Sequence, residues 1–181
     1  MRKNLAICFF YFAIAFLLHC LLFLAKNSQG LNMGTDSLEQ ENFFVYTSAL
    51  ESGSFPNTLT YADSRLFPGL PILISLLNSV VHNLPFSGLI ISALCLFIIF
   101  FVTYRLTENP VFSLWITLFP PIIYEQTSKI STETLAIALF MLIYLCFHKK
   151  KYFLASLLSG YATIVRPVSL CIFLGLLVFL L

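Results

Sequence analysis

The side chains of this chain that could do chemistry are a few charged residues placed between long apolar runs. Asp36 and Glu41 follow the first apolar run, where a carboxylate could accept a proton as a general base. Arg65 and Arg166 stand at the edges of apolar segments, and a guanidinium can hold a phosphate through two parallel hydrogen bonds. Lys129 is a further cation between two apolar runs. These residue types allow proton transfer beside a bound phosphate.

Each of these residues also has a purely structural interpretation. Asp36 and Glu41 would then be solvated loop acids, the usual fate of such residues. Either arginine could extend to lipid headgroups or balance a neighbouring acid. Lys129 follows Glu125 by four residues, a spacing that allows an ion pair along a helix. Both interpretations stay open for all of these charges.

Glu133 is expected to support the site, and a direct catalytic role stays an alternative. It lies at the predicted start of an apolar helix, two residues after Ser131. The positive end of the helix dipole favours a carboxylate there, and the Ser131 hydroxyl can cap the helix. This structural role explains Glu133 without a direct catalytic one.

We expect no metal, cofactor or nucleic acid. The five cysteines all lie in apolar runs without close spacing, which predicts packing residues and neither zinc ligands nor disulfides. His19 has no partner at metal-binding spacing, and no acidic cluster suits a divalent cation. The formal net charge of +2 is too small to indicate a nucleic-acid partner.

Composition predicts an integral membrane protein built from α-helices. Of the 181 residues, 59% are hydrophobic and only 10% are charged. A chain of this composition has more apolar surface than one soluble core can bury. We expect one membrane domain over 1–181, with the outer loop at 26–67 and further helices over 68–181. About six helices are predicted to cross the membrane: residues 5–25, 86–104, 111–124, 131–147, 152–164 and 167–181.

The basic residues between these segments predict which ends face the cytosol. If 68–82 lies in the outer interface without crossing, Arg105 and the lysines at 149–151 become cytosolic with the N-terminus, accompanied only by Glu108. The alternative, in which 68–82 crosses, expels the lysines, so we adopt the first arrangement. The first run is then a retained signal anchor, and residues 37–51 suit a helix on the outer surface of the membrane. All six candidate site residues share this non-cytosolic face: Asp36, Glu41, Arg65, Lys129, Glu133 and Arg166.

Three phrases of the sequence, in their order, resemble the GT-C membrane glycosyltransferases. They are DSRLFPGLPILI at 63–74, FPPIIY at 119–124 followed by STETL at 131–135, and YATIVRP at 161–167. The likeness is to polyprenyl-phosphate-sugar-dependent mannosyltransferases, among them the protein and GPI-anchor mannosyltransferases. It covers most of this chain but only the N-terminal part of a typical family member.

The resemblance implies an inverting transfer of a hexose, expected to be mannose, from a polyprenyl-phosphate carrier to an acceptor outside the cytosol. An outer-loop carboxylate would be the general base. Asp36 has the residue type usual in the family, whereas Glu41 has the better spacing, so both stay candidates. Arg65, Lys129 and Arg166 would bind the lipid phosphate. The expected partners are the lipid-linked sugar and membrane lipid, in a bacterial plasma membrane or the endoplasmic reticulum.

Two other functions compete with this one. A small six-span transporter or substrate-binding subunit predicts polar groups near the middle of its spans, whereas here they gather at the outer ends. The final segment is apolar to Leu181, which predicts a shortened chain and allows an inactive remnant of a transferase.

Overall fold

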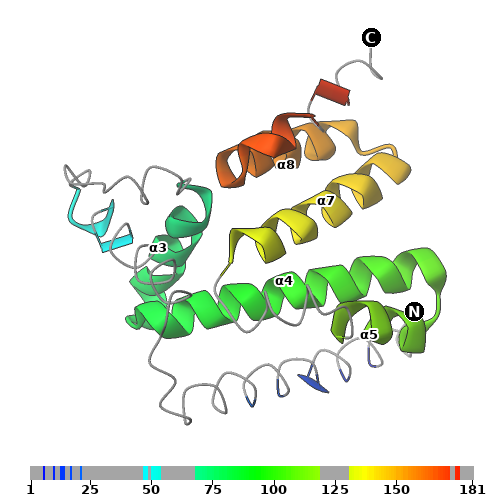
Figure 1. The fold of residues 1–181 in the computed structure, drawn as a ribbon, viewed down its shortest axis with the longest axis horizontal. Coiled ribbons are helices and arrows are strands. Elements are labelled where there is room, and N and C mark those ends of the chain that lie inside the picture. Colours follow the sequence, from blue (N-terminus) through cyan, green and yellow to red (C-terminus); the bar gives the residue numbers. More distant parts are fainter. Residues whose placement is uncertain are drawn as a thin grey trace.

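The computed structural model describes residues 68–118 and 131–171, together with 6, 10, 13–14, 17, 21, 47–48, 50–53 and 174–175. Every regular element within these residues is a helix, and none of them belongs to a strand (Figure 1). The expected all-α class is therefore confirmed for the described part of the chain.

Helix α3 spans Gly69–Val81 and agrees within a residue with the segment predicted at 68–82. Pro71 lies in its first turn, where a missing backbone N–H leaves no helical hydrogen bond unmade. The helix ends at His82, which has the left-handed conformation with a φ of 54°. Asn83 then caps the next helix by accepting a hydrogen bond from the Phe86 N–H at 3.1 Å.

Helix α4 spans Leu84–Thr107 and is the one described helix that is long and apolar enough to cross a membrane by itself, over Phe86–Thr107. Its 24 residues measure about 36 Å, more than the roughly 30 Å of a bilayer core. Apolar side chains cover its whole circumference, with Ile99 buried and Leu94 exposed. Among the described residues, a helix of membrane-spanning character therefore lies where the sequence predicts a span at 86–104.

Helix α5 spans Pro110–Leu118. The link from α4 to α5 has the same construction as the link from α3 to α4. Glu108 is left-handed with a φ of 54°, and Asn109 accepts the N–H groups of Val111 and Phe112, each at 3.1 Å. In both links a left-handed residue ends one helix and an asparagine caps the next. The predicted span 111–124 is thus helical from its start, and its residues 119–124 lie outside the described part.

Helices α7, Thr132–His148, and α8, Tyr152–Val165, match the segments predicted at 131–147 and 152–164. A turn of three lysines, Lys149–Lys151, joins them. Helix α8 ends at Arg166, whose backbone is extended, and the short 3-10 helix η2, Pro167–Ser169, follows. This end of α8 confirms the break predicted at the Arg-Pro pair. Its physical cause is that proline cannot continue an α-helix.

Helices α4 and α7 run side by side in the same direction, and α8 returns antiparallel to α7 (Figure 1). Helix α3 packs at the end of the bundle where α4 and α7 begin and α8 finishes. Small side chains at Ala138, Ala155 and Ala162 are fully buried and let the helices approach closely. One core unites the four helices; its larger members are Leu70, Ile74, Ile91, Ile99, Leu135, Leu139, Ile143 and Val165.

These helix directions sort the described charges between the two ends of the bundle. One end, here called the basic end, holds the last turns of α4 and α7 and the start of α8; its charged residues are Arg105, Glu108, Lys149, Lys150 and Lys151. The opposite end holds Glu51, Glu133 and Arg166. The described residues thus have the charge separation that the positive-inside rule predicted.

The outside of the bundle carries large exposed apolar side chains. Phe153 is 84% exposed, and Val80 and Leu76 are 76% and 65% exposed. Soluble monomers rarely show so many large apolar groups outside, whereas a lipid-facing surface requires them. This surface agrees with membrane residence.

Candidate functional site

The first turn of α7 is organised around the carboxylate of Glu133. The Ser131 Oγ accepts the backbone N–H of Glu133 at 3.1 Å and caps the helix, as the sequence predicted. The same hydroxyl donates its proton to Glu133 Oε2 at 2.6 Å, and Thr132 Oγ1 lies 3.4 Å from that oxygen. One oxygen of the carboxylate is therefore held by the helix start itself.

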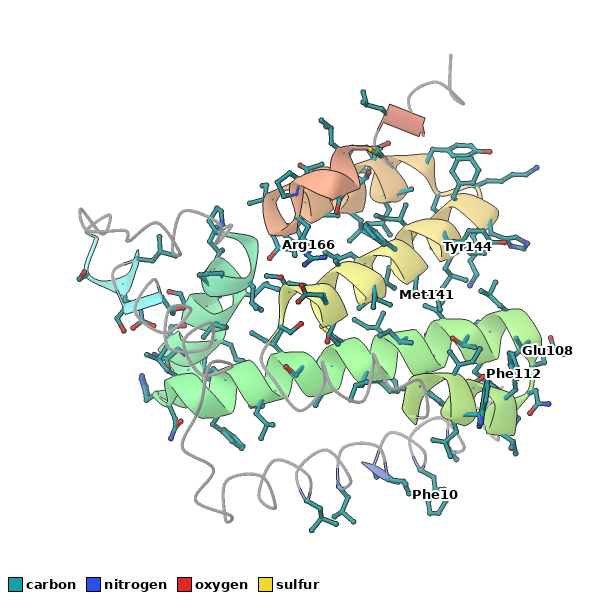
Figure 2. All side chains as sticks on the ribbon, in the orientation of Figure 1. Phe10, Glu108, Phe112, Met141, Tyr144 and Arg166 are labelled. Carbon is teal, nitrogen blue, oxygen red and sulfur yellow. The ribbon has the colours of Figure 1, made fainter. Side chains whose placement is uncertain are left out.

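The other oxygen of Glu133 accepts a charged hydrogen bond from Arg166. Arg166 Nη2 reaches Glu133 Oε1 across 33 residues of sequence and ties the end of α8 to the start of α7. The Arg166 side chain is 41% exposed and that of Glu133 is 26% exposed. Figure 2 shows Arg166 between the two helices. The pair lies at the rim of the bundle, neither in its core nor free in solvent.

A close contact between α3 and α8 lies beside this pair. The Tyr161 hydroxyl donates to the Gly69 carbonyl oxygen at 2.7 Å. A Cβ atom at Gly69 would lie 2.6 Å from Val165 Cγ2 and 2.8 Å from the backbone N and Cα of Val165. Only glycine allows this approach, because the contact is with backbone that cannot move aside. The first turn of α3 is thus fixed against the last turn of α8.

Described residues from each of the three sequence phrases therefore meet at one place. Gly69 comes from the first phrase, Glu133 from the second, and Tyr161 and Arg166 from the third. We call this meeting point, made of Gly69, Ser131, Glu133, Tyr161 and Arg166, the α3–α7–α8 junction. It lies at the end of the bundle opposite the lysine turn.

The junction can bind an anion but has no base to offer. Both oxygens of Glu133 are engaged, so this carboxylate orients Arg166 and has little capacity to take up a substrate proton. Arginine has five N–H donors, and the bond to Glu133 uses only one nitrogen. With Arg166 partly exposed, its remaining donors can reach a phosphate oxygen.

The other predicted site residues lie outside the described part of the chain: Asp36, Glu41, Arg65 and Lys129. The structure consequently brings Glu133 and Arg166 together and leaves the roles of those four residues as predictions. Glu51, at the end of the predicted surface helix, accepts a hydrogen bond from Asn78 Nδ2 at 2.9 Å. This bond attaches the end of the predicted surface helix to the last turns of α3, close to the start of α4.

Sequence reasoning did not single out the contact of Tyr161 with Gly69 or that of Asn78 with Glu51. A Pro-Gly pair at the start of an apolar segment was a visible signal for Gly69, since glycine often marks a close backbone approach. Which residue such a glycine contacts depends on how the helices pack, and this cannot be read from a single sequence.

A comparison of the chain with models of protein families, with curated proteins and with solved structures found no match. The likeness to GT-C enzymes therefore depends on the three phrases alone and stays a prediction.

Proposed function

We propose that this protein is a multi-pass membrane glycosyltransferase of the GT-C type. It would transfer a hexose, expected to be mannose, from a polyprenyl-phosphate carrier to an acceptor on the non-cytosolic face. The supporting observation is the α3–α7–α8 junction, where residues from all three family-like phrases surround a partly exposed arginine. Its position opposite the lysine turn agrees with a site outside the cytosol.

In the proposed reaction Arg166 binds the phosphate that becomes the leaving group. Glu133 and Ser131 hold the guanidinium in place, so its charge is oriented before negative charge grows on the phosphate oxygen. Arg65 and Lys129 would add further positive charge from segments outside the described residues.

A carboxylate of the outer loop, Asp36 or Glu41, completes the proposed chemistry. It takes the proton of the acceptor hydroxyl as the acceptor oxygen attacks the anomeric carbon. The bond from that carbon to the phosphate oxygen breaks, and the lipid phosphate leaves with the electron pair. Attack opposite the leaving group inverts the anomeric configuration.

A transfer assay with the purified chain in liposomes tests this proposal. We expect transfer of label from a polyprenyl-phosphate hexose to an added acceptor extract, with at least a hundredfold loss when the base is removed. Asp36→Asn and Glu41→Gln, made separately, identify the base, and Arg166→Gln is expected to weaken donor binding. Unchanged rates in both acid variants, with an active parent chain, would rule out the base mechanism.

The described residues also favour a second candidate, a subunit that binds the lipid carrier without transferring sugar. Among them, Glu133 is engaged by Arg166, Glu51 by Asn78, and Glu108 lies at the basic end. They supply a ligand for phosphate but no available carboxylate near it. Retention of polyprenyl phosphate that Arg166→Gln abolishes, with no transfer to any acceptor, would select this function.

A further inference from the structure

The basic end of the bundle concentrates more positive than negative charge among its described residues. The three lysines of the α7–α8 turn are all exposed, and Arg105 projects from the last turn of α4 at the same end. The guanidinium of Arg105 lies over the Phe101 ring, 5.2 Å from its centroid, and among the described residues no carboxylate is paired with it. Among the residues that the structure describes at this end, four cations thus stand against a single acid, Glu108.

The backbone of the lysine turn is fixed by hydrogen bonds. The Lys150 N–H bonds to the Phe147 carbonyl, and the Lys151 N–H bonds to the Cys146 carbonyl, each at 2.9 Å. These bonds close the last turn of α7 around Lys150, which is left-handed with a φ of 57°. Glycine or asparagine usually occupies such a place, because a Cβ atom there is strained. The turn thus holds Lys150 at a position that favours glycine.

Aromatic side chains border the lysine turn on both helices. Tyr144 is 55% exposed and its ring lies 6.4 Å from that of His148. Tyr152 is 37% exposed and packs edge-on against Phe147, with the centroids 5.5 Å apart. Tyrosine prefers the depth of lipid headgroups, where its ring is in apolar surroundings and its hydroxyl meets water. In a membrane, tyrosines in these positions would place the lysine turn at the depth of the headgroups.

We propose that the basic end binds the anionic headgroups of phospholipids in the leaflet that it faces. Charge complementarity identifies the partner: four cations at a tyrosine-lined end match an anionic membrane surface, whereas the opposite end has two carboxylates and one arginine among its described residues. Lys150 is the central ligand because the turn fixes its backbone. This inference needs a membrane-resident chain but does not depend on the transferase proposal.

Three left-handed residues provide matched variants for the test. Lys150, Glu108 and His82 have φ values of 57°, 54° and 54°, and each lies at the end of a helix. Lys150→Gly removes a cation from the basic end, Glu108→Gly removes the acid from that same end, and His82→Gly acts at the opposite end. All three relieve the same kind of backbone strain, so they differ mainly in charge and position.

The experiment exposes the detergent-solubilised full chain to equal amounts of phosphatidylglycerol and phosphatidylcholine and counts retained lipids by native mass spectrometry. We expect the parent chain to retain phosphatidylglycerol preferentially, and Lys150→Gly to reduce that preference about fivefold. Lys150→Arg should keep the preference, and Glu108→Gly and His82→Gly should not lower it. Each glycine variant should melt roughly 2–4 °C higher, which shows that the loss of lipid is not a loss of folding.

Two results would overturn the proposal. One is equal retention of the two lipids by the parent chain. The other is the same loss of phosphatidylglycerol in Glu108→Gly or His82→Gly as in Lys150→Gly. Should Lys150→Gly fail to fold, a salt titration of the parent chain decides, because headgroup binding must weaken as ionic strength rises. A preference for phosphatidylglycerol that stays the same as ionic strength rises would contradict binding by the cations of the basic end.

Discussion

The direction of the Arg166 side chain is set by its neighbours in sequence and in space. Pro167 ends α8 and leaves Arg166 in extended backbone, while Glu133 draws the guanidinium toward α7. The sequence predicted the helix break and the Ser131 cap because both depend on adjacent residues. The sequence also allowed an acid to pair with Arg166. It did not identify that acid as Glu133, because the two residues are 33 positions apart.

The ion pair itself is expected to contribute modestly to stability. Because both side chains are partly exposed, solvent screens the attraction, and a coupling free energy of about 1 kcal/mol is expected from a double-mutant cycle of Glu133→Gln and Arg166→Gln. Denaturant unfolding of the four proteins measures it. A coupling free energy indistinguishable from zero would contradict this expectation and mean that the pair adds nothing to stability.

The hydroxyl of Tyr161 provides a second test at this scale. Tyr161→Phe removes its hydrogen bond to the Gly69 carbonyl and should lower the free energy of unfolding by about 1 kcal/mol. Tyr144→Phe is a matched control, because Tyr144 is exposed near the far end of α7. Equal effects of the two changes would argue against the bond between α8 and α3.

At the scale of the helices, the close approach of α3 to α8 depends on Gly69, which has no side chain. The extents of α3, α7 and α8 were predicted from apolar runs and end signals, because such signals are local. The pairing of their ends was not predictable, since it depends on how closely two distant backbones can approach. The left-handed residues His82 and Glu108 were also missed, although each precedes an asparagine cap.

Gly69→Ala tests this approach directly. The added methyl group would meet the backbone of Val165, so α3 must shift away from α8, and a loss of about 1–3 kcal/mol in unfolding free energy is expected. Gly160→Ala on α8 is the control, because its Cβ would have open space. That change should leave stability unchanged or raise it by about 0.5–1 kcal/mol. Tolerance of alanine at both positions would show that α3 does not pack here.

At the scale of the whole molecule, the two ends of the bundle differ in charge. The sequence predicted this separation because the signs of its polar segments alternate, and α4, α7 and α8 carry the described charges to the expected ends. A crossing of the membrane by the shorter helices stays a prediction. Helices α7 and α8, with 17 and 14 residues, measure about 25 and 21 Å and would need help from neighbours or a thinner bilayer.

Cysteine labelling in sealed vesicles tests the proposed sidedness. In a chain without its native cysteines, Lys150→Cys and Ser52→Cys should react with an impermeant reagent from opposite sides of the membrane. Both positions are exposed, so access is not limited by burial. Reaction of both from one side would contradict the proposed topology, and with it the non-cytosolic site.

The hairpin of α7 and α8 has a consequence for how the chain is made. Its turn holds the lysines on one side, and its two free ends carry one carboxylate and one guanidinium that neutralise each other. If α7 and α8 both cross the membrane, as the sequence predicts, this hairpin would enter the bilayer as a unit, with its lysines on the ribosome side and its two charged ends neutralising each other. The contact that shapes the junction in the finished protein would thus also ease its insertion.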